Sequence, residues 1–261
     1  MDYNLKGKLV FVTGSTKGIG KAVAQLYHRE GADVIIHGRT PESVDRALKD
    51  IPTAHAVVGD LGDKAAVDDI INQVKDIGTV NILINNAGIF EPKPFAEITD
   101  TDWFRFFEIN VMSGVRFSRA FLPPMLLLNW GRIIFVSSES AINIPAEMIH
   151  YGMTKTAQLA VSRGLAELTK GTDVTVNAVL PGPTSSEGVI DFVKNLADAQ
   201  GRDTKAIEEE FFAKVRPSSL LQRFEDPMEI AQTIVFVGSP AASAINGAAI
   251  RADGGVVKSM V

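Results

Sequence analysis

The stretch LVFVTGSTKGIG, residues 9–20, decides how the fold begins. Its opening residues LVFVT form a short apolar run of the kind that makes a buried strand. The glycines Gly14, Gly18 and Gly20 follow, and GKAVAQLYHREG, residues 20–31, has the 3.6-residue period of a helix. Glycines allow a close backbone approach, and a helix start offers N–H groups to a pyrophosphate. The stretch predicts a phosphate-binding turn between strand and helix; the alternative is a tight turn that binds nothing.

The alternation of strand and helix continues along the chain. Further apolar runs that we expect to be strands lie at residues 34–38, 54–60, 80–86, 132–138, 174–181 and 248–251. Helical periodicity continues to residue 76 and returns over about 100–128, 151–170 and 227–237. Short apolar strands separated by helices indicate a parallel sheet covered on both faces. We predict a doubly wound, Rossmann-like α/β fold that forms a single domain over residues 1–261.

Residues 185–219 interrupt this alternation. They lie between a strand and the next expected helix, and they predict one or two extra helices inside a βα connection. In open parallel sheets, ligands bind beyond the carboxyl ends of the strands, where such connections lie. Connections this long in compact domains are usually functional or disordered. The segment is therefore a predicted substrate lid; the alternative is a surface excursion or a contact between subunits.

The composition excludes several classes of function. The formal net charge is −5 and the pI is about 5.4, so we expect neither a nucleic acid nor a membrane surface as partner. There is no cysteine, and none of the four histidines has HExxH spacing, so we expect no disulfide and no metal. No apolar run approaches the ~18 residues of a membrane helix, and the first residues do not resemble a secretory signal. A cytoplasmic protein is expected.

The stretch YGMTK, residues 151–155, contains a candidate acid/base pair. Residues four apart lie on one face of a helix, so the Lys155 ammonium can lie near the Tyr151 hydroxyl. An ordinary tyrosine pKa of about 10 is too high for proton exchange at neutral pH, and a neighbouring cation lowers it. The alternative is an ordinary surface pair; Ser138, which ends the preceding strand, favours the acid/base interpretation. His150, next to the tyrosine, is expected to be a pocket wall or a helix-start residue.

Several motifs, in order and spacing, resemble those of the short-chain dehydrogenase/reductase family in its compact single-domain form. The resemblance runs from about residue 6 to residue 256. The motifs that carry it are TGSTKGIG at 13–20, Asp60-Leu61, NNAG at 85–88, Asn110, Ser138, YGMTK at 151–155, PG at 181–182, and NG and DGG near the end.

The resemblance implies a role for each reactive residue. Ser138 orients the substrate oxygen and supports the developing oxyanion, while Tyr151 gives or takes the proton. Lys155 binds the nicotinamide ribose, and Asn110 holds a water that relays protons. The family counts thirteen residues from the serine to the tyrosine, which selects Ser138 over Ser137.

The same resemblance implies a nicotinamide dinucleotide as cofactor. The residues expected to contact it are Gly14, Ser15, Lys17, Gly18, Ile19, Gly20, Arg39, Asp60, Leu61, Asn86, Ala87, Gly88, Tyr151, Lys155, Pro181, Gly182 and Thr184. Among them, Asp60 resembles the family's adenine-contacting acid; alternatively it caps the helix that begins near Asp63.

The stretch VIIHGRT, residues 34–40, predicts which dinucleotide binds. Relatives that bind NAD have a carboxylate at the end of this strand, which holds both ribose hydroxyls and repels a 2′-phosphate. Here the position is Gly38, which leaves room, and Arg39 can meet the phosphate with a fork of N–H donors and stack on the adenine. Lys17 can approach from the other side. Either cation alone could be ordinary surface charge; together, with the acid missing, they favour NADP(H) over NAD(H).

These features predict an NADP-dependent oxidoreductase that transfers a hydride between the cofactor and a carbonyl/alcohol substrate, with Tyr151 as general acid/base. One rival is a non-catalytic, nucleotide-sensing regulatory protein on the same fold, although such proteins usually lose the tyrosine or the lysine. Another is an epimerase or dehydratase, whose relatives commonly have longer chains and a different glycine spacing.

The substrate is expected to be a small molecule, and an apolar ring, an acyl chain or a sugar would fit the lid composition equally well. Glu139 and Glu147 are expected near the opening of the substrate site, either as substrate contacts or as solvated side chains. The resemblance also implies a homo-oligomer, either a dimer or a tetramer.

Overall fold

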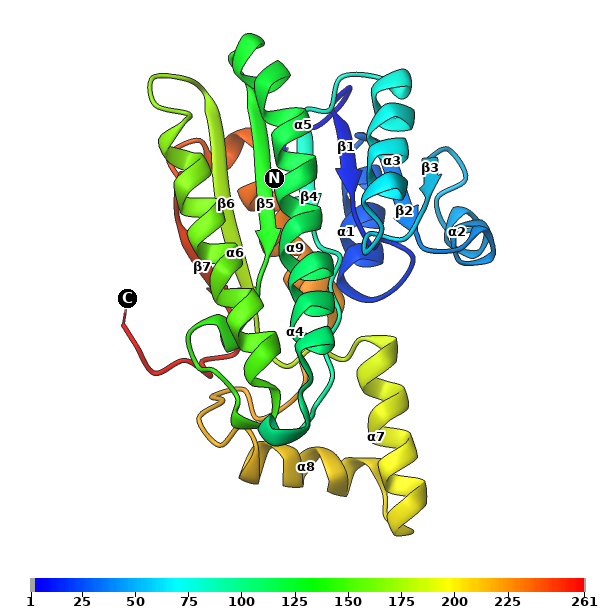
Figure 1. Cartoon of the computed structure of the whole chain (residues 1–261), viewed down its shortest axis with the longest axis vertical. Coiled ribbons are helices and arrows are strands. Elements are labelled where there is room, and N and C mark those ends of the chain that lie inside the picture. Colours follow the sequence, from blue (N-terminus) through cyan, green and yellow to red (C-terminus); the bar gives the residue numbers. More distant parts are fainter. Residues whose placement is uncertain (1–2, 261) are drawn as a thin grey trace.

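The strands form one parallel sheet, drawn in Figure 1 from a computed structural model in which residues 3–260 are described. They are β1 (Leu9–Val12), β2 (Asp33–Gly38), β3 (His55–Val58), β4 (Ile82–Asn85), β5 (Gly131–Val136), β6 (Val174–Pro181) and β7 (Ala249–Ala252). Their order in the sheet is β3-β2-β1-β4-β5-β6-β7, and every neighbouring pair is parallel. The predicted doubly wound fold is confirmed.

Helices follow the strands along the chain. They are α1 (Gly18–Arg29), α2 (Pro41–Leu48), α3 (Lys64–Ile77), α4 (Asp100–Phe107), α5 (Ser113–Leu127), α6 (Ile149–Glu167), α7 (Glu187–Gln200), α8 (Thr204–Lys214) and α9 (Pro227–Val237). The periodicity did not predict α2, because so short a helix shows barely two turns of the pattern. Its start did carry a signal: Thr40 caps it by accepting a hydrogen bond from the Ser43 N–H, and Pro41 follows.

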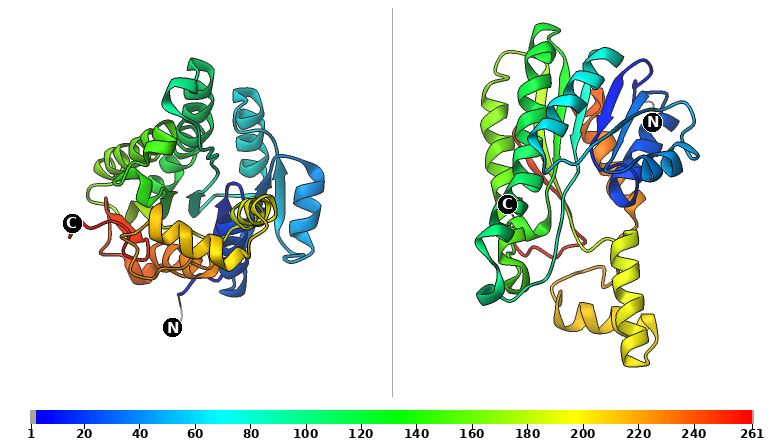
Figure 2. Two further views of the ribbon diagram at one scale, coloured as in Figure 1. Left: turned by 90° about the horizontal axis from the view of Figure 1, so that it is seen from below. Right: turned by 45° about the vertical axis from the view of Figure 1, so that its right-hand side comes forward.

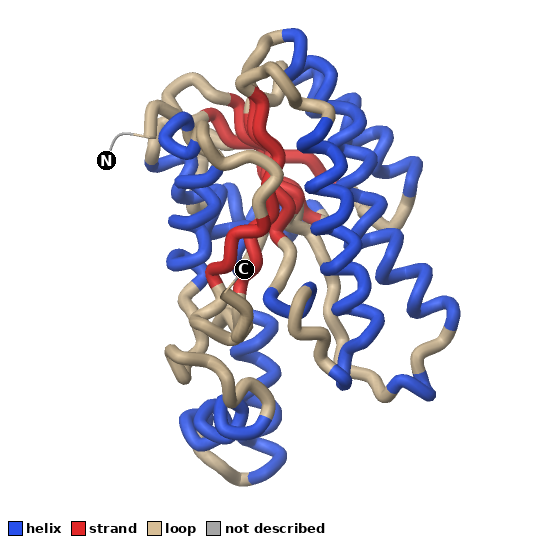
Figure 3. Tube along the Cα trace, turned by 90° about the vertical axis from the view of Figure 1, so that its left-hand side faces the viewer, coloured by secondary structure: helices blue, strands red, loops and turns tan. Residues whose placement is uncertain are grey.

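Two layers of helices enclose the sheet, which Figure 3 shows between them. Successive side chains of β1 point alternately to the two helix layers. Val10 and Val12 face the layer that contains α1, α2 and α9, whereas Phe11 faces α3, α5 and α6. Phe11 is fully buried and packs edge-on against Phe117 of α5, with ring centroids 5.3 Å apart. Burial of one such ring stabilises the fold by about 1.5–3 kcal/mol.

The carboxyl end of β1 is the point where the winding reverses. The chain leaves β1 through α1 on one face, whereas it leaves the neighbouring β4 through α4 and α5 on the other face. In doubly wound sheets the crevice at such a point binds the ligand. The fold therefore places a ligand site at the turn after β1.

The segment 185–219 contains two helices, α7 and α8, as its sequence indicated. Both lie beyond the carboxyl ends of the strands in Figure 1, and the second view in Figure 2 shows the same arrangement. The inserted helices thus lie on the side of the sheet where a ligand binds.

The expected long helix over 100–128 contains an irregular turn. Helices α4 and α5 are joined without a break by a π-helical turn at Glu108–Met112, and Asn110 is within it. Turns of this type inside α-helices are frequent at functional sites. Among residues 3–260, no helix has the length and apolar character needed to cross a membrane.

Candidate active site

The turn after β1 is held in a single shape by backbone contacts. Gly14 has a φ of +63°, and a Cβ there would lie 3.0 Å from the Cα of Ala87, so this position requires glycine. The Ser15 hydroxyl donates to the Val12 carbonyl at 2.8 Å and accepts from the His37 N–H at 2.9 Å. The turn is therefore fixed both to β1 and to β2.

His37 is part of this framework, which the sequence analysis missed. Its Nδ1 accepts a hydrogen bond of 3.0 Å from the Gly14 N–H, so its proton is on Nε2, which donates to the Gly59 carbonyl at 3.0 Å. Burial lowers the pKa of His37 below its ordinary value and keeps the ring neutral. In the sequence, this role of His37 was indicated by the presence of a polar residue inside the apolar run 34–38.

The NNAG segment after β4 closes the other side of the turn. The Asn86 amide donates to the Thr13 and Gly14 carbonyls at 2.9 and 3.0 Å. The Thr13 hydroxyl accepts from the backbone N–H groups of Asn86 and Ala87, both at 3.0 Å. Gly88 then lies beside two predicted catalytic residues: a Cβ on it would be 3.3 Å from Asn110 Oδ1 and 3.5 Å from Lys155 Nζ.

Asn110 connects this segment to α6. Its Oδ1 accepts from the Ile89 N–H at 2.8 Å, and its Nδ2 donates to the Ile89 carbonyl and the Thr154 hydroxyl, both at 3.0 Å. Its backbone carbonyl accepts a 2.6 Å hydrogen bond from the Gln158 amide. The π-helical turn allows the carbonyl of Asn110 to serve this side chain, so α5 and α6 are held together at the site.

Ser138 and Tyr151 meet at the carboxyl end of β5. The Ser138 hydroxyl oxygen accepts from the Ser140 N–H at 3.1 Å, which leaves its own hydrogen for donation to the Tyr151 oxygen. Ser137, the competing choice, is turned away and donates to the Lys155 carbonyl. Phe90 forms an apolar wall, with its ring centroid 6.4 Å from that of Tyr151. The structure thus favours Ser138 over Ser137 as the partner of the tyrosine.

The acidity of Tyr151 differs from the expectation. Burial raises its pKa to about 12, against the smaller opposing effect of the hydrogen bond from Ser138. The Lys155 ammonium, 5.6 Å from the centre of the Tyr151 ring, is buried and donates to the Val136 carbonyl at 3.0 Å. Burial also lowers the pKa of Lys155 to about 8. For Tyr151, desolvation therefore outweighs the opposing effects of the Ser138 hydrogen bond and the Arg216 cation, and the phenol is protonated at neutral pH.

Glu139 and Glu147 both pair with one cation, Arg216; Glu139 is buried, whereas Glu147 is also exposed to solvent. Arg216 Nε lies 2.9 Å from Glu139 Oε1, and its terminal nitrogen lies 3.3 Å from Glu147 Oε1. Ser140 also donates to Glu139, and both Glu139 and Arg216 are buried. Because Arg216 follows α8, this ion pair ties the end of the predicted lid to the residue after Ser138. A partner 77 positions away could not be read from the sequence.

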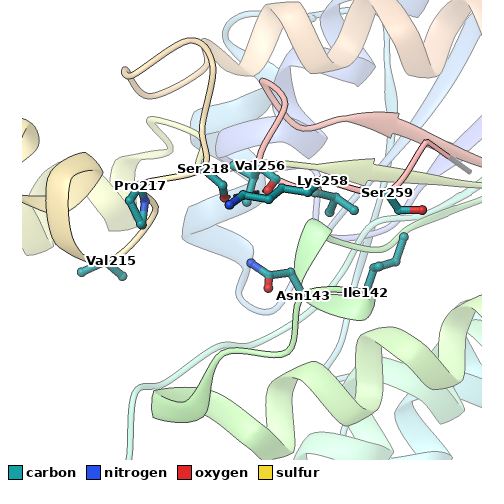
Figure 4. Close-up of a pocket in the computed structure, with 9 residues that line it drawn as sticks. Ile142, Asn143, Val215, Pro217, Ser218, Val256, Lys258 and Ser259 are labelled. Atoms are coloured by element: carbon teal, nitrogen blue, oxygen red, sulfur yellow. Dashed lines mark hydrogen bonds between the residues drawn. The ribbon is translucent and has the colours of Figure 1, made fainter.

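A cavity of about 470 Å³ lies beside this ion pair. Figure 4 shows it between the loop after Ala141, the chain on either side of Arg216, and the carboxyl-terminal segment. Its lining residues are Ile142, Asn143, Val215, Pro217, Ser218, Val256, Val257, Lys258 and Ser259. The cavity is thus next to the chain that follows α8, and the predicted catalytic side chains lie outside its lining.

Gly38, at the end of β2, does not leave the open room that was expected for a 2′-phosphate. The space at Gly38 is already filled, since a Cβ there would lie 2.6 Å from Thr16 Cγ2 and 2.7 Å from Ser43 Oγ. The glycine permits close packing of α2 and the turn rather than leaving open room. Arg39 and Lys17 are exposed, and within residues 3–260 neither forms an ion pair.

The remaining residues predicted to contact the cofactor lie at or after the ends of β3 and β6, at the carboxyl edge of the sheet. Asp60 is exposed and accepts from the Gly62 N–H at 2.8 Å, whereas the cap of α3 is Asp63, so Asp60 is not the cap. Pro181 ends β6, and the Thr184 hydroxyl donates to the Gly182 carbonyl at 3.0 Å. Leu61 is buried.

His150 is buried next to Tyr151, with its ring centroid 4.0 Å from that of Phe106 and 6.0 Å from that of Trp103. It is the second residue of α6, which agrees with the helix-start alternative. Within residues 3–260, no group of three or more acidic or histidine side chains could hold a metal ion.

These residues fit a nicotinamide dinucleotide. A glycine-rich helix start faces the switch point, and Gly88 allows the backbone to pass close to Asn110 and Lys155, near Tyr151. Fold and site together define a doubly wound α/β protein in which Ser138, Tyr151 and Lys155 meet near a glycine-rich turn.

Comparisons with known proteins agree with this description of the fold. A family model for short chain dehydrogenase matches residues 8–197. The chain is 49% identical to the uncharacterized oxidoreductase YvrD of Bacillus subtilis (strain 168), with 100% of both chains covered. The protein therefore belongs to the short-chain dehydrogenase/reductase family of oxidoreductases.

Two solved structures are similar over nearly the whole chain. L-sorbose reductase from Gluconobacter frateurii, in complex with NADPH and L-sorbose, superposes with a TM-score of 0.94 at 29% identity, with 100% of both chains covered. A 3-oxoacyl (acyl-carrier-protein) reductase from Agrobacterium tumefaciens C58 with NADP bound superposes with a TM-score of 0.86 at 29% identity, covering 97% of this chain and 96% of the other.

Proposed function

We propose that this protein is an NADP(H)-dependent oxidoreductase that interconverts a carbonyl and an alcohol, with Tyr151 as the general acid/base. The observation that carries the proposal is the meeting of Ser138, Tyr151, Lys155 and Asn110 beside Gly88. The cofactor, when bound, supplies the hydride. The regulatory alternative is not favoured, because the complete acid/base group is present.

The protonation of the site supports reduction of a carbonyl. With a pKa of about 12, the Tyr151 phenol is protonated at neutral pH and can donate its proton to an oxygen that becomes negative. The Ser138 hydroxyl, oriented by the Ser140 N–H, can donate a second hydrogen bond to the same oxygen. We further propose that Lys155 holds the nicotinamide ribose and that Asn110 holds the relay water.

The proposed preference for NADP(H) rests on Arg39 and Lys17. Both are exposed cations near the end of β2, and NADPH or NADP is bound in the similar structures named above. A charge-assisted hydrogen bond contributes about 1.5–3 kcal/mol, which corresponds to about 10- to 100-fold in affinity. We therefore expect Arg39→Ala to raise KM for NADPH by about 10- to 100-fold while KM for NADH changes little.

Steady-state kinetics with both cofactors checks this expectation. Arg46→Ala is a matched control, because it removes an exposed arginine from α2 whose side chain donates to the Glu42 carbonyl. An Asp at Gly38 would not be a clean test, since the packing there would also change. A parent enzyme with a higher kcat/KM for NADH than for NADPH would contradict the proposal.

The substrate is proposed to be a small carbonyl or alcohol. The two similar proteins are named as reductases of L-sorbose and of 3-oxoacyl (acyl-carrier-protein), so the comparison alone does not choose between a sugar and an acyl chain. We propose that residues 185–219 form the substrate lid of a single domain, because α7 and α8 lie beyond the carboxyl ends of the strands. A cytoplasmic location stays a prediction.

We also propose that the protein is a dimer or a tetramer. Large apolar side chains are exposed on α4 and α5: Phe104 on α4 is 73% exposed, and Leu127 at the end of α5 is 88% exposed. Isolated exposed residues of this size are tolerated, but several on adjoining helices favour an interface. Light scattering should give a mass of at least twice 28.1 kDa at micromolar concentration, and a single 28.1 kDa species would contradict the assembly.

A further inference from the structure

The first residue of the lid helix α7 contacts the phosphate-binding turn. Oε2 of Glu187 accepts a 2.6 Å hydrogen bond from the Gly18 N–H, although the two residues are 169 positions apart. The preceding residue is equally close, because a Cβ on Gly18 would lie 3.2 Å from Ser186 Cβ. The start of α7 and the start of α1 are therefore in direct contact.

This contact uses a group that normally serves a phosphate. The first N–H groups of a helix have no carbonyl partner within the helix, and they attract anions together with the positive end of the helix dipole. Gly18 is the first residue of α1, and the first turn of α1 has no acidic residue of its own. Glu187 supplies the missing anion from the lid.

We propose that Glu187 is a latch that competes with the cofactor for the phosphate-binding turn, so that binding of the dinucleotide releases α7. The proposal rests on the proposed function, since it assumes that a nicotinamide dinucleotide binds here. A single N–H cannot donate fully to the carboxylate and to a pyrophosphate oxygen, and two anions in contact repel each other. The carboxylate must therefore leave when the pyrophosphate arrives.

The latch has two consequences. If the turn is available only when Glu187 has left it, the apparent dissociation constant of the cofactor is the intrinsic constant divided by the unlatched fraction. Because the latch residue begins the lid helix, the position of α7 is also coupled to the cofactor site, and coupling of this kind is reciprocal. A change that removes the latch should then both tighten cofactor binding and move the lid.

The test is a fluorescence titration of the full chain with NADPH. Glu187→Gln and Glu187→Ala should lower the dissociation constant about 5- to 30-fold, the effect of losing one charged hydrogen bond and one repulsion. Asp191→Asn is the matched control: it removes the same charge one turn further along α7, from an exposed side chain. This control separates the latch from a general effect of negative charge.

A second measurement follows the lid itself. Since the chain has no cysteine, Lys194→Cys places a single thiol on an exposed position of α7 for an environment-sensitive dye. NADPH should change the dye signal in the parent, and Glu187→Gln should produce most of that change without NADPH. Unchanged binding and dye signal in the Glu187 variants, or equal tightening by Asp191→Asn, would overturn the latch alone. A parent chain that binds neither NADPH nor NADH would overturn the proposed function and the latch together.

Discussion

Replacing Tyr151 by Phe should lower kcat about 10²- to 10⁴-fold, which corresponds to about 2.7–5.4 kcal/mol in the activation barrier. The change deletes the one oxygen that receives the Ser138 hydrogen bond and carries the exchangeable proton. The ring, its contact with Phe90 and the position of Lys155 need not change. Binding of NADPH should therefore stay close to that of the parent while turnover is lost.

Steady-state rates and NADPH titrations on the same preparations check this pattern. Tyr3→Phe is the matched control, since it removes the same atom from a partly buried tyrosine at the start of the chain. A Tyr151→Phe enzyme that turned over a verified substrate at the parental rate would show that another group moves the proton. A loss of both binding and turnover would instead indicate a structural role.

Replacing Arg216 by Met should lower the free energy of unfolding by about 3–5 kcal/mol. Arg216 and Glu139 are 7% and 3% exposed, so removal of the guanidinium leaves a carboxylate buried without its countercharge. Denaturant titration measures the loss. The double variant Glu139→Gln/Arg216→Met should recover most of it, because the uncompensated charge is then gone. Equal losses in the single and double variants would mean that packing, and not charge, makes the contribution.

The loss of unfolding free energy in Arg216→Met should also depend on pH. Burial raises the pKa of Glu139 above its ordinary value, and the Arg216 cation opposes this effect. Without Arg216, the folded chain holds the Glu139 proton more tightly than the unfolded chain does, so stability falls as pH rises through and above about 4.5. The deficit of Arg216→Met should thus be smaller at pH 5 than at pH 8.

The fold could be predicted because its signals are local. Strand and helix periods along the chain gave the parallel sheet, and the spacing of glycines and of YGMTK located both ends of the site. Short elements were harder: α2 spans only eight residues, and its Thr40-Pro41 start was its main signal. The π-helical turn at Asn110 has no distinct period, so residues 100–128 predicted an uninterrupted α-helix.

The electrostatics of the site could not be predicted, since they depend on burial and on distant partners. The YxxxK spacing alone suggested a lowered tyrosine pKa, yet desolvation raises it to about 12. Glu139 pairs with Arg216, which is 77 positions away along the chain, and the Gly18 N–H donates to Glu187, which is 169 positions away. At Gly38, the sequence showed that a side chain is missing but not that Thr16 and Ser43 fill its place.

The most direct test of the central claim is transfer of deuterium, from NADPH that carries deuterium at both C4 positions, to a carbonyl substrate found among ketones, quinones, sugars and acyl thioesters. The proposed reaction predicts that the label appears on the carbinol carbon of the product, with one NADPH consumed per alcohol formed. The same experiment with Tyr151→Phe should give almost no labelled product. An epimerase or dehydratase would change its substrate without net consumption of NADPH, and a regulatory protein would bind NADPH without turnover. Either result, or product formed without the label, would contradict the account.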